Sequence, residues 1–282
     1  MADSIVPVLL LPEHIKLTPS RLPLLRAIQT LLNESYTKTY CARPEIFGTT
    51  HVRLAEPAQL ADIVGDTGFT VILVRVPTVE DGKARIGEVI ATGSVKDFGD
   101  GDVESYAQWS KNLGGREWAA KKRGQGLDDK GVEKERGAVR RFEVTAFGVA
   151  AHCQGAGLGA KVLQEIEWIV SSNAYGPRGQ HVTDGTARAE GIELQTSETT
   201  SQLEGINLDT LKALRKNTNA SGFRRDEHDI DRPKLVLMGI KELGNEAYYQ
   251  RRGFKSVWTG TVPVGMWDCK KECNMVYMEK VV

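Results

Sequence analysis

A glycine-rich run of six residues has the composition of a backbone anion site. Gln154-Gly155-Ala156-Gly157-Leu158-Gly159 stands between a β-type run that ends at Val149 and an apolar helical stripe that begins at Leu158. Glycine lets a backbone come close to a ligand, and the first N–H groups of a helix, with the positive end of its dipole, suit a phosphate. We therefore predict that the backbone from Gln154 to Ala160 binds a phosphate or diphosphate.

The spacing of these glycines differs from that of the common nucleotide motifs. A dinucleotide site has the order Gly-x-Gly-x-x-Gly, whereas the glycines here stand at 155, 157 and 159. Gly159 is followed by Ala160 rather than by the Lys-Ser or Lys-Thr of a phosphate-binding loop of the Walker type. Spacing alone therefore leaves open a glycine-rich turn that binds no ligand.

A strand and a helix must position this run. Residues 142–149 combine β-branched and aromatic types with a two-residue alternation, which places one set of side chains on each face: Glu143, Thr145, Phe147 and Val149 against Phe142, Val144, Ala146 and Gly148. After the run, apolar residues recur at helical spacing: Leu158, Val162, Leu163, Ile166 and Ile169, with Lys161, Gln164, Glu165 and Glu167 on the polar side. The pattern predicts a strand–loop–helix unit.

Two sequence motifs, one in the glycine-rich run and one near the C-terminus, resemble those of the GNAT superfamily of acyl-CoA N-acyltransferases. Gln154, Gly157 and Gly159 match motif A, Gln/Arg-x-x-Gly-x-Gly/Ala, which follows a strand in that family. Near the C-terminus, Tyr249 stands four residues before Gly253-Phe254, as in motif B. The resemblance covers roughly residues 86–170 and 234–282, and the chain departs from the family by two long polar inserts, at about 98–137 and 171–232.

The resemblance implies an α+β fold of the GNAT type. Its sheet is mixed and mostly antiparallel, is flanked by helices, and has a V-shaped opening between two parallel strands where coenzyme A enters. We expect a single acyltransferase domain over residues 1–282 that carries the two inserts. The implied acyl donor is acetyl-CoA, and the implied acceptor is an amine.

Family resemblance also assigns the residues that hold the cofactor. They are the end of the central strand, the glycine-rich run and one asparagine: Phe147, Gly148, Val149, Gln154, Gly155, Ala156, Gly157, Leu158, Gly159, Ala160 and Asn245. Backbone N–H groups of the run would bind the diphosphate. A backbone N–H between Phe147 and Val149 would stabilise the oxygen of the thioester as it gains negative charge.

Two side chains are candidates for proton transfer. Tyr249, carried over from motif B, would protonate the leaving thiolate, since a tyrosine of pKa ~10 can protonate a thiolate whose parent pKa is ~8.5; alternatively, its ring packs on the cofactor and its hydroxyl only orients the sulfur. Glu143, on the same strand face as Phe147, would remove the proton of the amine, directly or through water. The alternative for Glu143 is an ion pair with Arg140 or Arg141.

Composition narrows the class of protein. The 37 basic residues balance the 37 acidic ones, so no excess charge argues for a nucleic acid or a charged membrane surface as partner. Four cysteines in 282 residues do not form a disulfide framework, which favours a reducing, cytoplasmic or nuclear, location. The apolar run over 5–12 is short and interrupted by two prolines, so we expect no signal peptide, and no stretch is long enough to span a bilayer.

The rest of the chain predicts further elements. We expect a strand at 14–17, a helix starting near Ser20, a loop over 36–49, a short helix over 56–64, a hairpin of strands at 69–76 and 86–96, a helix over 207–216, a strand at 235–239 parallel to the central strand, a helix over 242–252 and strands at 254–258 and 275–278. By resemblance, the loop with Tyr36, Tyr40 and Phe47 borders the acceptor site, unless these aromatics only pack on the domain, and the linker 260–268 reaches back over that site.

Asp226, His228 and Asp231 form one grouping with a metal-binding character, and a single histidine among acids favours a solvated loop over a metal site. Cys269 and Cys273 lack a second pair of ligands at zinc spacing, which favours ordinary reduced thiols.

Two functions fit these features. The first is an N-acetyltransferase that transfers an acetyl group from acetyl-CoA to a small primary amine by direct attack in a ternary complex, or, in a variant of the same chemistry, to a protein or peptide amine. The second is a GNAT-like binding module that has lost catalysis. The oligomeric state stays open between a monomer and a homodimer.

Overall fold

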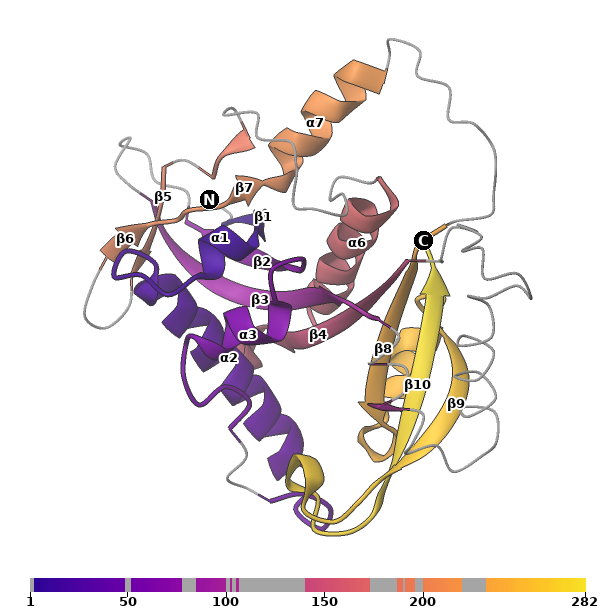
Figure 1. Cartoon of the computed structure of the whole chain (residues 1–282). Coiled ribbons are helices and arrows are strands. Elements are labelled where there is room, and N and C mark those ends of the chain that lie inside the picture. Colours follow the sequence, from indigo (N-terminus) through magenta and orange to yellow (C-terminus); the bar gives the residue numbers. More distant parts are fainter. Residues whose placement is uncertain are drawn as a thin grey trace. The chain divides into compact units, whose positions relative to one another are not determined.

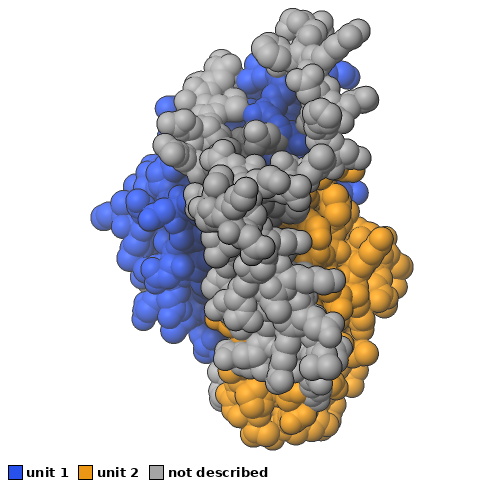
Figure 2. All heavy atoms as spheres, turned by 45° about the vertical axis from the view of Figure 1, so that its right-hand side comes forward, with its two compact units in different colours: residues 1–38, 52–96, 145–227 blue, residues 39–51, 97–144, 228–282 orange. Residues whose placement is uncertain are grey.

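The protein was studied as a computed structural model that describes residues 3–48, 52–77, 85–99, 102, 105–106, 140–172, 187–189, 191–195, 200–219 and 232–282. Its contacts divide the chain into two compact units, coloured in Figure 2. Unit 1 comprises residues 1–38, 52–96 and 145–227, and unit 2 comprises residues 39–51, 97–144 and 228–282. Much of both predicted inserts, including Asp226, His228 and Asp231, lies outside the described residues.

Unit 1 contains most of the helices that the structure describes. Its elements are β1 (Ser4–Leu10), α1 (Pro12–Ile15), α2 (Leu22–Cys41, whose last residues belong to unit 2), α3 (Gln59–Val64), β2 (Phe69–Val76), β3 (Arg85–Asp97), the second part of β4 (Arg141–Val149), η1 (Ala151–Cys153), α6 (Leu158–Ser171), β5 (Ile192–Gln195), β6 (Thr200–Gln202), β7 (Ile206–Asn207) and α7 (Leu208–Asn219) (Figure 1).

The strands of unit 1 follow the order β7-β1-β2-β3-β4, and β5 joins β3 and β6. The predicted hairpin of β2 and β3 is confirmed, with Phe69 opposite Val95 and Arg75 opposite Glu88. It forms because β2 is a continuous run of β-branched and apolar residues, all buried except Arg75. β5 runs parallel to β3, whereas the β1–β2, β1–β7 and β5–β6 pairs are antiparallel.

The first strand is not where the sequence predicted it. Residues 14–17 do not form a strand; the apolar run before them forms β1, and α1 follows. Pro7 lies inside β1 opposite Leu73, and the β1–β7 ladder begins only at Val8. Proline is tolerated where a strand has a free edge, since it lacks an N–H group.

Helices cover both faces of the unit 1 sheet (Figure 1). A Cβ atom added to Gly148 of β4 would meet Leu31 and Leu32 of α2 at 3.3 and 3.2 Å, whereas one added to Gly93 of β3 would meet Val162 of α6 at 2.7 Å. α2 is also longer than predicted, because its apolar stripe continues through Tyr36 and Tyr40. Buried aliphatic residues of α2, β1 and β2 make up the core: Leu25, Ile28, Leu32, Val8, Leu10, Ile72 and Val74.

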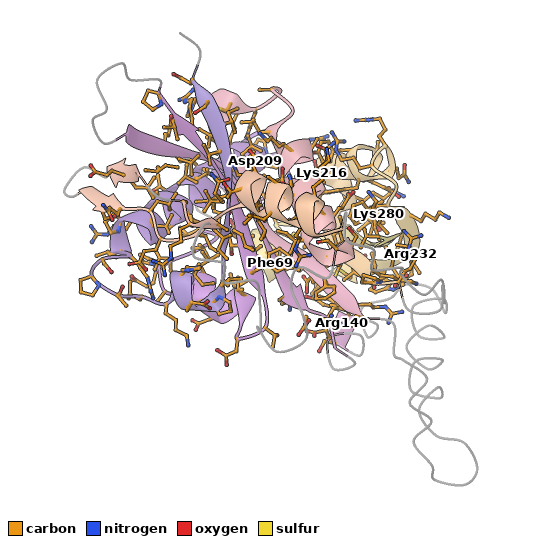
Figure 3. All side chains as sticks on the ribbon, turned by 90° about the horizontal axis from the view of Figure 1, so that it is seen from above. Phe69, Arg140, Asp209, Lys216, Arg232 and Lys280 are labelled. Carbon is orange, nitrogen blue, oxygen red and sulfur yellow. The ribbon has the colours of Figure 1, made fainter. Side chains whose placement is uncertain are left out.

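The second insert contributes structure that the sequence did not predict. Its strands β5, β6 and β7 extend the sheet, and α7 packs next to α6. The predicted helix over 207–216 is confirmed, and Asn207 begins it by accepting hydrogen bonds from the N–H groups of Asp209 and Thr210. Figure 3 labels Asp209 and Lys216 in the first and last turns of α7.

One residue of α6 was assigned to the wrong side. Glu165, expected on the polar face, is only 5% exposed, and its carboxylate forms an ion pair with Lys212 of α7. Lys212 and Arg215 also lie over the ring of Trp168, at 5.6 and 5.8 Å from its centroid. Glu165 thus lies at the contact between α6 and α7, which a single-helix pattern does not reveal.

Unit 2 is built on the strand order β4-β8-β10-β9. Its elements are the first part of β4, β8 (Lys234–Ile240), η3 (Lys241–Leu243), α8 (Asn245–Gln250), β9 (Lys255–Val262), η4 (Met266–Asp268) and β10 (Cys273–Val281). The predicted parallel pair is confirmed, with Arg141–Glu143 of β4 beside Lys234–Val236 of β8. β10 is antiparallel to both β8 and β9, so the mixed, mostly antiparallel sheet of the predicted α+β fold is confirmed.

A cluster of charged and aromatic residues lies at the centre of unit 2. Glu279 of β10 forms ion pairs with Arg141 at 3.4 Å and with Lys234 at 2.7 Å, and accepts a hydrogen bond from the hydroxyl of Tyr277 at 3.0 Å. The ring of Tyr277 stacks on Trp258 with centroids 5.0 Å apart. Burial by itself would raise the pKa of Glu279, but the two cations outweigh burial and lower it.

The last predicted helix is shorter than expected. Residues 241–243 form a 3-10 turn, Gly244 adopts a left-handed conformation with φ 74°, and α8 begins at Asn245. The two final strands are confirmed and longer than predicted, and β9 takes up the first part of the predicted linker. Among the described residues there is no helix with both the length and the apolar composition that crossing a bilayer requires.

Candidate active site

In unit 1, the predicted strand–loop–helix unit is confirmed. β4 ends at Val149, the N–H of Ala150 donates to the carbonyl of Ile90 at 2.9 Å, and the short turn η1 leads into the loop. Gly155 and Gly157 have φ angles of 88° and 80°, in the left-handed region that favours glycine. The loop thus depends on glycine at both positions, and α6 starts directly after Gly157.

The N-terminus of α6 is equipped to accept an anion. No side chain caps the helix at Gly157, and its first turn contains no acidic residue. Helical hydrogen bonding resumes only with the N–H of Lys161, which donates to the carbonyl of Gly157 at 3.2 Å. A Cβ atom at Gly155 or Gly157 would meet nothing within 4 Å, so the loop backbone is open to a ligand. A diphosphate fits this arrangement through backbone N–H groups and the helix dipole.

Side chains around the loop hold its shape. The amide of Gln154 donates to the carbonyl of Val149 at 3.3 Å, and Lys38 donates to the carbonyl of Ala151 at 3.1 Å. His152, 54% exposed, has its Nε2 atom 3.1 Å from the carboxylate of Glu88. Gln154 was predicted to contact the cofactor; in the structure its side chain hydrogen-bonds back to Val149, and the residue as a whole is exposed.

β4 contains a strained residue that the sequence did not reveal. Ala146 has a φ angle of 42°, and non-glycine residues with positive φ inside a strand mark bulges or local strain that gather at functional sites. On either side of it, Thr145, Phe147 and Val149 are half-buried, whereas Gly148 is buried. The strain lies next to the backbone N–H groups that we predicted to stabilise the oxyanion. Nothing in an alanine flanked by strand residues predicts it.

In unit 2, Glu143 lies at the end of the parallel ladder. It pairs with Val236 of β8, and it is 7% exposed. The guanidinium of Arg141 forms its ion pair with Glu279, and that of Arg140 lies 4.8 Å from the ring centroid of Phe142. Burial, together with the carboxylates of Glu279 and Glu143, raises the pKa of Tyr277. Glu143 is thus a buried carboxylate at the end of the parallel ladder.

Tyr249 is carried by α8 within a set of aromatic contacts. Its ring meets those of Phe254 and Tyr248 edge-on, with centroids 5.8 and 5.2 Å apart, and its carbonyl accepts from the N–H of Phe254 at 3.2 Å. Tyr248 is half-buried beneath the guanidinium of Arg252, and burial raises its pKa. Asn245, one turn before Tyr249, is exposed.

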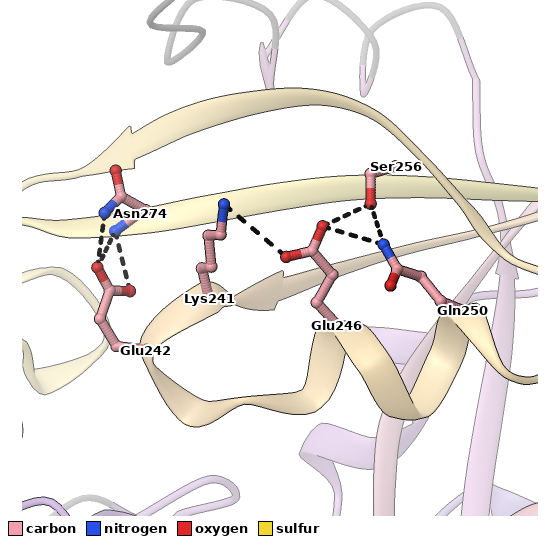
Figure 4. A network of polar contacts seen from close by, with 6 residues as sticks. All are labelled: Lys241, Glu242, Glu246, Gln250, Ser256 and Asn274. Atoms are coloured by element: carbon pink, nitrogen blue, oxygen red, sulfur yellow. Dashed lines mark hydrogen bonds and ion pairs between the residues drawn. The ribbon is translucent and has the colours of Figure 1, made fainter.

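Hydrogen bonds tie η3 and α8 to the two final strands (Figure 4). The carboxylate of Glu242 accepts from the backbone N–H of Asn274 at 2.9 Å and from its amide at 2.7 Å. Glu246 accepts from the hydroxyl of Ser256 at 2.7 Å. Because α8 has only six residues, these contacts and the aromatic packing of Tyr249 determine where it lies.

The expected acceptor loop and linker meet within unit 2. Tyr40 and Phe47 are buried and stacked, with centroids 4.4 Å apart, which supports the alternative that they pack in the domain. The N–H of Gly48 donates to the carbonyl of Asp268 at 2.8 Å, so the linker end does reach the loop. In unit 1, Tyr36 is half-buried, with the guanidinium of Arg53 5.6 Å from its ring centroid.

No family model and no curated protein matches this chain. Among similar solved structures is Arabidopsis thaliana NAA60 in complex with a bisubstrate analogue, at 10% identity, 99% coverage of both chains and a TM-score of 0.43. Another is the ribosomal-protein-S18-alanine N-acetyltransferase from Escherichia coli, at 9% identity, covering 99% of this chain and 94% of the other, with a TM-score of 0.42. A third is FeeM, an N-acyl amino acid synthase from uncultured soil microbes, at 11% identity, 98% and 91% coverage and a TM-score of 0.40.

These levels of similarity carry no conclusion about the reaction of this chain. The support that the structure adds comes from the helices and strands of this chain. The described chain has the α+β fold and the strand–loop–helix unit on which its resemblance to the GNAT superfamily rests.

Proposed function

We propose that this protein is an N-acetyltransferase that transfers an acetyl group from acetyl-CoA to a primary amine by direct attack in a ternary complex. The observation that carries the proposal is the uncapped N-terminus of α6 behind two left-handed glycines, Gly155 and Gly157. An acyl-CoA presents a diphosphate to such a site, and backbone N–H groups can bind it without a charged side chain. Acetyl is proposed as the acyl group, and a small molecule as the acceptor.

Each proposed residue has one task in the reaction. The backbone of Gln154–Ala160 binds the diphosphate, Asn245 adds a polar contact to the cofactor, and a backbone N–H between Phe147 and Val149 stabilises the oxyanion. The amine nitrogen attacks the thioester carbon, the C–S bond breaks, and an amide forms. Glu143 takes the proton that the amine loses, and Tyr249 gives a proton to the departing thiolate.

Acetyl-CoA binding can be tested first, by thermal unfolding of the purified protein with and without the ligand. At about a hundred times its Kd, the ligand should stabilise the fold by roughly 2.7 kcal/mol. Release of free thiol in the presence of a panel of primary amines then tests transfer. A folded protein that millimolar acetyl-CoA does not stabilise would contradict the proposal, and stabilisation without thiol release would favour the binding module.

A further inference from the structure

The turn that carries Trp267 and Asp268 is strained. Their φ angles are 50° and 60°, and together with Ala146 they are the described non-glycine residues with positive φ. A bulky residue such as tryptophan rarely adopts this conformation, which costs about 1–2 kcal/mol and persists only where the surroundings enforce it. Strain of this kind is a reason to look for function in the turn.

Hydrogen bonds with the segment around Gly48 enforce the conformation. The N–H of Gly48 donates to the carbonyl of Asp268 at 2.8 Å, and the N–H of Lys270 donates to the carbonyl of Ile46 at 2.7 Å. Phe47 and Cys269 form a β-bridge between these two contacts, and the turn closes on itself through the N–H of Gly265 and the carbonyl of Cys269, 2.8 Å apart. The backbone of Asp268 is therefore fixed on both sides.

The carboxylate of Asp268 lies directly over Gly48. A Cβ atom added to Gly48 would lie 2.0 Å from Oδ2 and 2.4 Å from Oδ1 of Asp268, so the carboxylate takes the space that any side chain at position 48 would need. Oδ2 is buried and has no hydrogen-bond partner within the described part of the chain. Asp268 as a whole is half-buried, so its exposed area lies on its other atoms.

A nearby cation would stabilise a carboxylate held in this way. Burying one of its oxygens without a partner costs free energy, and the loss is offset when a positive charge meets the accessible side of the group. Among the described residues, no ion pair joins Asp268 to a lysine, arginine or histidine. In an amine acyltransferase, a protonated amine of the acceptor can supply such a positive charge.

The reacting amine itself is a poor match for this role. It must lose its proton before it can attack, whereas a fixed carboxylate stabilises the protonated form. A second amine on the same acceptor, which does not react, has no such conflict.

We propose that Asp268 binds a second, non-reacting ammonium group of the acceptor, so that the substrate class is diamines and longer amines with two positive charges. The inference rests on the proposed function for its identification of the ligand as an acceptor. Gly48 is part of the site, since only glycine leaves the carboxylate in place.

The test compares 1,5-diaminopentane with 5-amino-1-pentanol, which keeps the reacting amine and has a hydroxyl in place of the second ammonium. Binding is measured by thermal unfolding, and turnover by thiol release with acetyl-CoA. Wild-type protein should bind the diamine about tenfold or more tightly than the amino alcohol, the effect of one hydrogen-bonded charge. The KM values should differ in the same direction.

Two variants should abolish this preference by different routes. Asp268→Asn keeps the shape of the side chain and removes its charge, while Gly48→Ala keeps the charge and displaces the carboxylate. Both should raise the KM for the diamine about tenfold, to a value close to the KM for the amino alcohol. Glu272→Gln, an equal charge change at an exposed position in the same loop, is the matched control and should keep the preference.

The outcomes separate this inference from the proposed function. If wild-type protein binds the two amines equally, binds neither, or if Asp268→Asn keeps the preference for the diamine, the inference is overturned. Those results stand whether or not acetyl-CoA stabilises the protein, because diamine binding is measured without it. Absence of stabilisation by acetyl-CoA, in turn, contradicts the proposed function and leaves a diamine effect that depends on Asp268 as evidence for the cation site.

Discussion

The glycine-rich loop of unit 1, residues 154–157, and helix α8 of unit 2 are built in opposite ways. Residues 154–157 of the loop are exposed and offer backbone groups, and their conformation comes from glycine φ angles. α8 has six residues and offers side chains. It is kept in place by the hydrogen bond from Ser256 to Glu246, by the packing of Tyr249 on Phe254, and by the bonds from Asn274 that hold the preceding turn η3. The conformation of the loop depends on residues that are neighbours in the sequence. The position of α8 depends on residues of strands that lie elsewhere in the chain.

The difference predicts how each region responds to substitution. A change in the loop should alter ligand affinity with little effect on folding, since few tertiary contacts depend on the exposed glycines. Changes around α8, or in the cluster of Glu279, Arg141, Lys234 and Tyr277, should alter stability or turnover. The polar groups there are hydrogen-bonded or ion-paired to one another, so the loss of one leaves its partners unsatisfied. The following predictions test this contrast.

The largest effect is expected at Glu279. Glu279→Gln removes the carboxylate that partners Arg141 and Lys234, and leaving a buried cation without its partner costs about 3 kcal/mol. Chemical denaturation should show this loss in the free energy of unfolding. Glu34→Gln, at an exposed position of α2, should change it by less than about 0.5 kcal/mol. Equal effects at the two sites would remove the special status of the cluster.

Glu279 should also influence how the stability of the fold falls at acidic pH. Because the folded state lowers the pKa of Glu279, its stabilising contribution is present above the unfolded pKa of about 4.3 and is lost as pH falls through the lower folded value. The melting temperature of the wild type should therefore fall in this acidic range, and the fall should be shallower in Glu279→Gln. Parallel profiles would show that other carboxylates govern acid unfolding.

Tyr249→Phe tests the proposed role of a side chain on α8. Loss of a general acid should lower kcat about a hundredfold, with acetyl-CoA binding unchanged. Tyr248→Phe, on the same helix, serves as the matched control and should retain turnover, since Tyr248 packs under Arg252. Full activity in Tyr249→Phe would leave the hydroxyl with an orienting role only.

Substitution of Gly157 tests the proposed role of the loop backbone. Aspartate and asparagine have nearly the same shape and both tolerate the left-handed region, so Gly157→Asp and Gly157→Asn differ mainly in charge. A negative charge at this helix N-terminus should weaken acetyl-CoA binding about thirtyfold relative to the asparagine variant, with similar melting temperatures in the absence of ligand. Equal affinities would show that the diphosphate binds elsewhere.

The smallest effect is expected at Glu242. Glu242→Gln weakens the contacts with Asn274 that hold η3, and should cost about 1 kcal/mol of stability. Titration with acetyl-CoA should give an unchanged Kd, the reverse of the Gly157 result. A change in affinity without a change in stability would break the contrast between the two regions.

Local features could be predicted from the sequence because their physical causes are local. β2 matches its predicted bounds since a run of β-branched residues specifies a strand by itself, and the strand, the glycine loop and α6 follow from side-chain periodicity and glycine φ angles. Asn207 marks the start of α7 for the same kind of reason. The family resemblance rests on these same local patterns.

Other features depend on partners far along the chain. Pro7 can lie in β1 only because β7 joins that strand beyond it, and Glu165 is buried only because α7 supplies Lys212. The left-handed conformations of Ala146 and Trp267 have no counterpart in residue type. Contacts such as that between Lys270 and Pro44, 226 residues apart, hold the turn around Asp268.

The sequence by itself thus determined the α+β class, the glycine-rich loop before α6 and the candidate residues on it. Only the tertiary structure decided which carboxylates are buried, which tyrosine is packed under an arginine, and that Asp268 lies over Gly48. The physical reason is that backbone conformation follows from neighbouring residues, whereas burial, charge pairing and enforced strain arise when distant segments pack together.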